Sequence, residues 1–166
     1  MQKTTDPKRI HDAPWLQVRD NEILARLLNK FGIDPVQHRD QLINRVAGAF
    51  KNVPFENLAE PTMLVDMKLA CNEIENQLAA GGKRSVNCDA GYLDHNKVVL
   101  ASAKEAGQKI YLDKGIYADL AGRYKAGKYQ PFEWSFPDFK DGRYDKELLE
   151  IRGVYLEQVR KGREKK

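Results

Sequence analysis

The chain has 166 residues, of which 42% are hydrophobic and 31% are charged, as in a globular protein with a single core. This composition excludes a disordered chain, and apolar runs such as Val98–Ala101 are far too short to span a bilayer. The first ten residues have no apolar segment behind their charges, so a secretory signal is not expected. We expect a cytosolic protein with no membrane partner.

The formal net charge of +4 comes from the last seven residues, which hold five cations and one anion. A basic tail can contact phosphates, but it is also typical of a solvated helix end. The two cysteines, Cys71 and Cys88, cannot build a disulfide framework, and no C-x-x-C pair indicates zinc. We therefore expect free thiols, no bound metal and no cofactor.

The first half of the chain is predicted to be helical. Residues 1–19 are polar and proline-containing, which indicates a flexible lead-in to a single domain over 20–162. Helices are expected from Asp20 to Gly32 and from Asp34 onward, within a helical part spanning 20–80. The clearest helix follows Pro61, and its apolar residues share one face: Leu64, Met67, Cys71, Ile74 and Leu78.

The second half, over 84–140, is predicted to be rich in strands. "RSVNC" indicates a strand over 84–89, and "HNKVVLASAKEAG" a short helix that ends at Gly107. Three strand-like runs over 108–132, separated by turns at 113–115 and 126–127, predict an antiparallel meander. A last helix over 143–162 precedes a basic tail at 163–166, and its buried stripe is Leu148, Ile151, Tyr155 and Val159.

These elements predict an α+β fold, in which a small, mainly antiparallel sheet packs with helices from the N-terminal half and with a C-terminal helix. Side chains alternate along strands, which divides the meander into two faces. The apolar face should pack on the helices and holds Ile110, Leu112, Ile116, Ala118 and Leu120. The opposite face is polar and holds Lys109, Tyr111, Tyr117, Asp119 and Arg123.

Two interpretations of the polar face stay open. A half-solvated sheet surface is common in antiparallel sheets. Two tyrosines beside a lysine also suit a flat anionic or aromatic ligand, which they can bind by stacking and charge-assisted hydrogen bonds.

The stretch "RSVNCDAGYL" contains the second group of polar candidates. Alternation turns Val86 and Cys88 to the core and Asn87 and Asp89 to the other side, before a turn expected at Ala90–Gly91. Turn amides there could cradle an anion, or Asn87 and Asp89 could simply satisfy those amides. The candidate ligand-binding residues of both groups are Arg84, Asn87, Asp89, Tyr92, Lys104, Lys109, Tyr111, Tyr117 and Asp119.

Standard catalytic signatures are absent from the sequence, including the P-loop, the G-x-G-x-x-G and the H-E-x-x-H motifs. His95 follows Cys88 by seven residues, but alternation buries Cys88, whereas thiolate chemistry needs an accessible sulfur of lowered pKa. Catalytic residues stay unassigned. Asp89 or Asp119 could serve as an acid or a base.

Five segments carry a resemblance to a known family. They are "LVDMKLACNEIE", "KRSVNCDAGYL", "VVLASAKE", "KIYLDKGIYAD" and "FEWSFPDFKDGRY", in this order. On these motifs, residues from about 50 to 162 resemble a bacterial family catalogued as domain of unknown function 4416. That family usually has proline where Ala90 stands, His-Arg in place of Gln108–Lys109, and glutamate in place of Asp119. These departures fall on polar positions, so retention of any family activity is open.

A second, shorter resemblance covers residues 23–58. This segment, which ends in "PFENL", is similar to the helical N-terminus of arylamine N-acetyltransferases. Those enzymes use a Cys-His-Asp triad with a histidine well downstream of the cysteine. No histidine follows His95, so the triad cannot be assembled and acetyltransferase activity is not expected.

The leading functional hypothesis is a cytosolic protein that binds a small anionic or aromatic ligand of the nucleotide or sugar phosphate type. A module for single-stranded nucleic acid, built on the meander tyrosines and the basic tail, is one alternative. An enzyme of unassigned chemistry is another, and a partner-binding role for the aromatic loop 132–136 is a third. The sequence does not set the oligomeric state.

Overall fold

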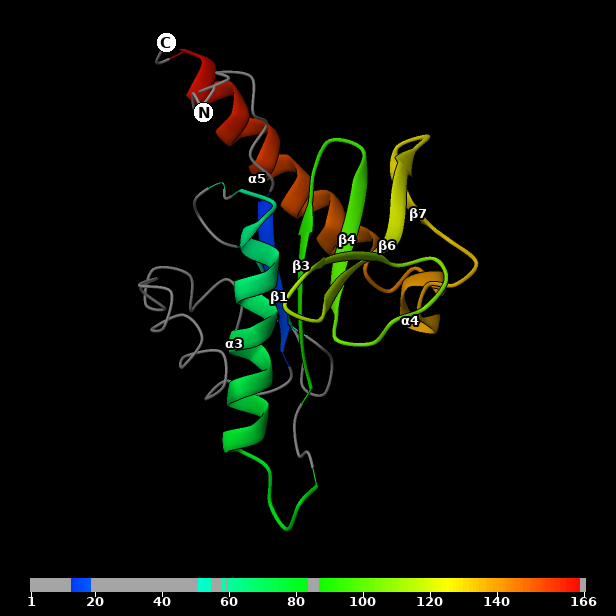
Figure 1. The fold of residues 1–166 in the computed structure, drawn as a ribbon. Coiled ribbons are helices and arrows are strands. Elements are labelled where there is room, and N and C mark those ends of the chain that lie inside the picture. Colours follow the sequence, from blue (N-terminus) through cyan, green and yellow to red (C-terminus); the bar gives the residue numbers. More distant parts are fainter. Residues whose placement is uncertain (1–12, 19–50, 55–57, 59, 84–86, 165–166) are drawn as a thin grey trace.

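The computed structural model describes residues 13–18, 51–54, 58, 60–83 and 87–164 (Figure 1). The helices expected within 20–50 and the beginning of the strand expected over 84–89 lie outside these residues. The described elements, in chain order, are β1 (Ala13–Val18), β2 (Lys51–Pro54), α3 (Met63–Gln77), β3 (Cys88–Leu93), β4 (Lys97–Ser102), β5 (Ile110–Asp113), β6 (Ile116–Lys125), β7 (Lys128–Pro131), α4 (Pro137–Lys140) and α5 (Asp145–Glu164).

The seven strands form one antiparallel sheet in the order β2-β1-β3-β4-β6-β5, and β7 also pairs with β6. The predicted meander is confirmed, with β5 and β7 pairing along successive parts of β6. Its two hairpins turn at 114–115 and 126–127, where all four residues have a positive φ. A pair of positive φ angles matches the right-handed twist of the flanking strands. The expected α+β class is likewise confirmed.

Three local expectations are wrong. β3 runs through Ala90 and Gly91, where a turn was expected, because β1 and β4 pair with it on its two sides. Residues 97–102, expected to be helical, form β4, in which the β-branched Val98 and Val99 favour a strand. Residues 13–18, expected in a flexible lead-in, form β1.

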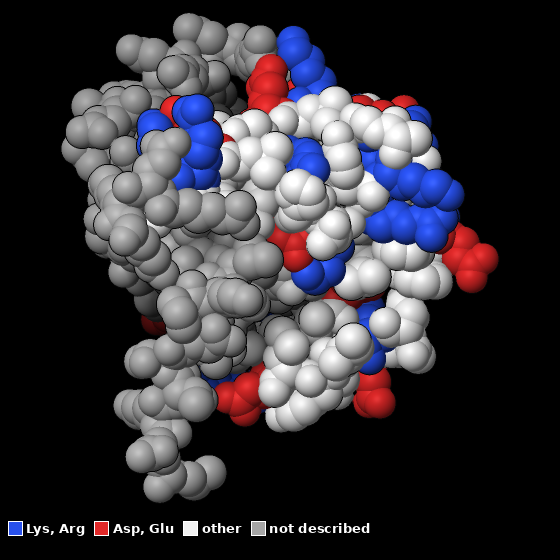
Figure 2. Space-filling view, turned by 90° about the horizontal axis from the view of Figure 1, so that it is seen from above, with Lys and Arg blue, Asp and Glu red and all other residues white. Residues whose placement is uncertain are grey.

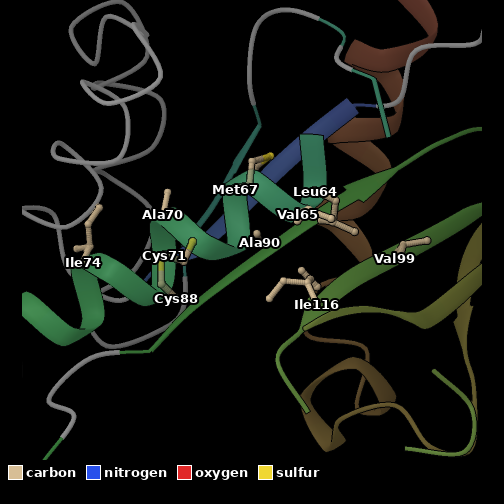
Figure 3. Close-up of a cluster of buried hydrophobic side chains, with 11 residues drawn as sticks. Leu64, Val65, Met67, Ala70, Cys71, Ile74, Cys88, Ala90, Val99 and Ile116 are labelled. Atoms are coloured by element: carbon tan, nitrogen blue, oxygen red, sulfur yellow. The ribbon is translucent and has the colours of Figure 1, made fainter. Parts of the chain in front are cut away.

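α3 covers one face of the sheet, and its predicted buried stripe is confirmed. Met67 and Cys71 pack against residues of β3, β4 and β6, and Figure 3 shows Cys71 and Cys88 pointing toward each other. Both thiols are free and buried. The sheet residues of this core are Cys88, Ala90, Val99, Ala101 and Ile116.

α5 covers the opposite face, together with the short helix α4. The expected stripe of Leu148, Ile151 and Tyr155 is buried against Val98 and Leu100 of β4. Residues of β4 therefore point alternately to α3 and to α5, and all four central positions of this strand are buried. No described helix, α5 included, is long and apolar enough to cross a membrane.

The apolar face of the meander is only partly covered. On β6, Ile116 is buried and Ala118 and Leu120 pack against the α3 core, as expected. On β5 the expectation is wrong, since Ile110 is 67% exposed and Leu112 is 38% exposed. The reason is topological: β5 ends the sheet, and no described helix buries its side chains.

Tyr129 of β7 generates a pH prediction. Its buried hydroxyl donates to the carbonyl oxygen of Asp94 at 2.7 Å, and burial raises its pKa to about 12 despite the opposing charge of Arg152. Between pH 10 and 12 the unfolded chain has lost this proton while the folded chain keeps it, so the free energy of unfolding falls as the pH rises.

We expect the free energy of unfolding, measured in urea, to fall over this pH range by about 2–3 kcal/mol more for the wild type than for Tyr129→Phe. The subtraction removes the contribution of other titrating groups. Parallel pH profiles for the two proteins would contradict the assignment.

Candidate functional site

A cavity of about 690 Å³ opens between the end of the sheet, α3 and the segment around α4. Both helical layers contribute to its lining, Lys68 and Asn72 from α3 and residues 136–138 from the α4 segment, and the sheet contributes polar residues next to its apolar core. Along β4, the buried Leu100 is followed two residues later by Ser102; along β6, the buried Ala121 is preceded two residues earlier by Asp119. Since alternate residues share a face, the polar pair continues the covered apolar surface into the cavity.

Lys109 and Asp119 form a nearly buried ion pair in the cavity wall. The Nζ of Lys109 lies 3.4 Å from Oδ2 of Asp119 and donates to Oγ of Ser102 at 2.8 Å. The two charged side chains are only 12% and 14% exposed. The register explains their meeting, because Ile110 pairs with Ala118 and the preceding Lys109 therefore lies beside Asp119. Breaking such a pair leaves a buried charge uncompensated.

A second charged group lies at the beginning of β3. Nδ2 of Asn87 donates to Oδ2 of Asp89 at 2.6 Å, and Nζ of Lys68 lies 3.6 Å from Oδ1 of Asp89. Lys68 comes from α3, is 6% exposed, and donates to the carbonyl oxygen of Cys88 at 2.9 Å. Its ammonium thus ties the helix to the strand and orients one wall of the cavity.

The third wall comes from the residues around α4. Phe136 and Pro137 line it with apolar surface, and Asp138 and Arg143 add one charge of each sign. Oδ2 of Asp138 accepts a hydrogen bond from the Tyr144 hydroxyl at 2.8 Å. The guanidinium of Arg143 binds the nearby Asp141, and this hydrogen bonding lowers the pKa of the Asp141 carboxyl.

The cavity brings together five of the nine residues that the sequence predicted: Asn87, Asp89, Lys104, Lys109 and Asp119. These residues come from two segments that the sequence analysis treated separately. Their meeting depends on β4, which lies between β3 and β6 and aligns the ends of the two strands.

The other predicted residues do not line the cavity. Tyr111 and Tyr117 pack edge to face, with ring centroids 5.4 Å apart, and Tyr111 is 58% exposed. Tyr92 packs against the α3 core, and its ring lies 5.8 Å from Nζ of Lys97. Arg84 lies outside the described residues.

Sequence reasoning missed several lining residues. Lys68 lies beside Met67 on the buried face of α3, which also holds the buried Glu75, and nothing in the sequence placed this lysine in a cavity. Asp138 and Arg143 belong to the family motif "FEWSFPDFKDGRY", of which only the aromatic loop 132–136 was given a possible role. Nothing local to the sequence indicated that this loop returns to the end of the sheet.

Two chemical options find no geometric support. Among the described residues, no group of three or more histidine, cysteine, aspartate or glutamate side chains could hold a metal ion. The thiol of Cys88 is fully buried, and its pKa is raised by a hydrogen bond with Cys71, by burial and by the charges of Cys71 and Glu75. His95 is exposed in the turn after β3, at the far end of the strand from Cys88.

Comparison with known proteins gives one match. The family model described as "Domain of unknown function (DUF4416)" matches residues 47–155, most of the chain. The chain belongs to this family. The match contains all the residues that line the cavity, and it ends within α5.

No curated protein and no solved structure is matched. The resemblance of residues 23–58 to arylamine N-acetyltransferases therefore stays a sequence-based expectation, and most of that segment lies outside the described residues.

The thiol environment generates a labelling prediction. Since both cysteines are buried and the pKa of Cys88 is raised, the native protein at pH 8 should react with a thiol reagent at least about 100-fold more slowly than the same protein in denaturant. The measurement is the absorbance of released thionitrobenzoate over time. Rapid modification of Cys88 in the folded protein would contradict its placement.

Proposed function

We propose that this protein binds a small anionic organic ligand, of the nucleotide or sugar phosphate type, in the cavity at the end of the sheet. The observation that carries the proposal is the convergence of charged and hydrogen-bonding groups from α3, β3, β4, β6 and the α4 region. Its described lining has four cationic side chains (Lys68, Lys104, Lys109 and Arg143) against three carboxylates (Asp89, Asp119 and Asp138). Lys68, Lys109 and Arg143 are paired with Asp89, Asp119 and Asp141, so Lys104 is the lining cation whose charge an anion would balance.

Lys104 is the cation best suited to hold the anionic group. Lys68 and Lys109 are engaged with Asp89 and Asp119, whereas Lys104 is exposed and forms no ion pair with a described residue. Its main chain is fixed, because its amide donates to Oγ of Ser102 at 3.1 Å. A mobile ammonium on a fixed backbone can reach a phosphate at the cavity mouth without losing an existing partner.

Phe136 supports the aromatic part of the ligand class. It lines the cavity and is 55% exposed, so a flat ring could stack on its face without displacing a packed side chain. The buried free thiols are compatible with a reducing compartment, and we propose a cytosolic location.

A single-stranded nucleic acid is less well supported as the ligand. On the face seen in Figure 2, lysines and arginines form separate groups among uncharged and acidic residues, not one basic stripe. The exposed Tyr111 lies outside the cavity lining. If Asp89 or Asp119 had an enzymatic role, the substrate would bind in this same cavity, so ligand binding is the property to establish first.

The proposal is tested by a thermal-shift screen of nucleotides and sugar phosphates, followed by calorimetry on any ligand that raises Tm. We expect Lys104→Ala to weaken binding by about 10- to 100-fold, the range for a hydrogen bond to a charged group. Lys125→Ala, at the exposed end of β6 and outside the cavity lining, should leave affinity unchanged and serves as the matched control.

Two outcomes would count against the proposal. One is the absence of any Tm shift across both ligand classes. The other is tight binding of a single-stranded oligonucleotide that weakens steeply with salt and is insensitive to Lys104→Ala, because that result indicates phosphate contacts elsewhere on the surface.

A further inference from the structure

Two carboxylates of the cavity each have one oxygen that the described protein leaves without a hydrogen bond. Oδ1 of Asp119 and Oδ1 of Asp138 are both buried and have no partner. The other oxygen of each is held, in Asp119 by the ammonium of Lys109 and in Asp138 by the hydroxyl of Tyr144. Both residues line the same cavity although they come from different elements, β6 and α4.

A buried acceptor without a donor is costly, and most such groups in folded proteins find a partner. Here each carboxylate is anchored on one side by its own contact, so its rotation to satisfy the other oxygen would break that contact. Donors that enter the cavity from outside the protein would satisfy these two oxygens without breaking either contact. Solvent water and a ligand are the two sources.

The chemistry of the surroundings selects the kind of donor. A divalent cation is disfavoured, because no described group of three acidic, histidine or cysteine side chains lies close enough to hold one. An ammonium group is disfavoured by the cations already present: Lys109 lies 3.4 Å from Asp119, and Lys104 and Arg143 line the same cavity. Hydroxyl groups donate to carboxylates without adding positive charge.

We propose, building on the anionic ligand above, that Asp119 and Asp138 bind hydroxyl groups of that ligand. One end of the molecule is then an anionic group held by Lys104, and the other end is a polyol whose hydroxyls donate to the two free carboxylate oxygens. The shared chemistry is a hydroxyl-bearing phosphate. A phosphorylated sugar and a ribonucleotide are its two sources.

The test measures how much each hydroxyl contributes to affinity, using calorimetry on pairs of ligands with the same phosphate. One arm compares ribose 5-phosphate with 2-deoxyribose 5-phosphate. The second arm compares AMP with its 2′-deoxy and 3′-deoxy analogues. We expect removal of at least one hydroxyl to weaken binding by about 10-fold or more in the arm that contains the true ligand class.

Variants connect that loss to the two carboxylates. In Asp138→Ala and in Asp119→Asn, the hydroxyl-bearing ligand should lose affinity while its deoxy analogue loses little. The ratio of the two affinities, hydroxyl-bearing over deoxy, should therefore fall toward one. Asp113→Asn is the matched control: this exposed aspartate at the end of β5 does not line the cavity and, within the described part of the chain, contacts none of its charged residues. Its ratio should equal that of the wild type.

The outcomes separate this inference from the proposed function. Equal affinity for hydroxyl and deoxy ligands, or a ratio unchanged in Asp138→Ala, overturns the assignment of Asp119 and Asp138 and shows that water satisfies them, while anion binding stands. Tighter binding of phosphoethanolamine than of either hydroxyl ligand overturns it in favour of an ammonium. Failure of every phosphate to bind overturns both proposals. If Asp119→Asn does not fold, Asp138→Ala carries the test alone.

Discussion

The structure depends on the burial of its central strand on both faces. Val99 and Ala101 of β4 point to the α3 core, while Val98 and Leu100 point to the α5 core. On the α5 side this apolar surface ends at Leu100, and the next position on the same face is Ser102. The cavity lies at this change from apolar to polar residues, so its location follows from where the packing of α4 and α5 stops.

The elements whose apolar residues recur at regular spacing could be predicted from the sequence. The helices α3 and α5 have apolar positions at helical spacing, and the β5–β6–β7 hairpins combine alternation with turn residues. β4 could not be predicted in the same way, because a strand buried on both faces shows a continuous apolar run, which is equally compatible with a short helix. The strand predicted over 84–89 ends earlier than the observed β3, because Gly91 suggested a turn. In the structure, β1 and β4 pair with β3 on both sides and keep it extended through Gly91.

The candidate site could be predicted only in its local part. The alternation of side chains along strands predicted that Lys109 and Asp119 share one sheet face, and likewise Asn87 and Asp89. This was possible because the members of each pair are close in the sequence. Lys68 and Asp138 could not be assigned, because α3 and the α4 region reach the cavity through tertiary packing. Tyr92 does not line the cavity, because it lies on the strand positions that face α3, together with Cys88 and Ala90.

The central claim is that the end of the sheet between β3, β4 and β6 holds a binding site, and amide chemical shifts test it most directly. Titration of the ¹⁵N-labelled protein with ribose 5-phosphate or AMP should move the signals of Asp89, Ser102, Lys104 and Asp119 most strongly, because these residues border the cavity. Shifts confined to Tyr111 and the C-terminal tail, with the cavity signals unmoved, would contradict the account.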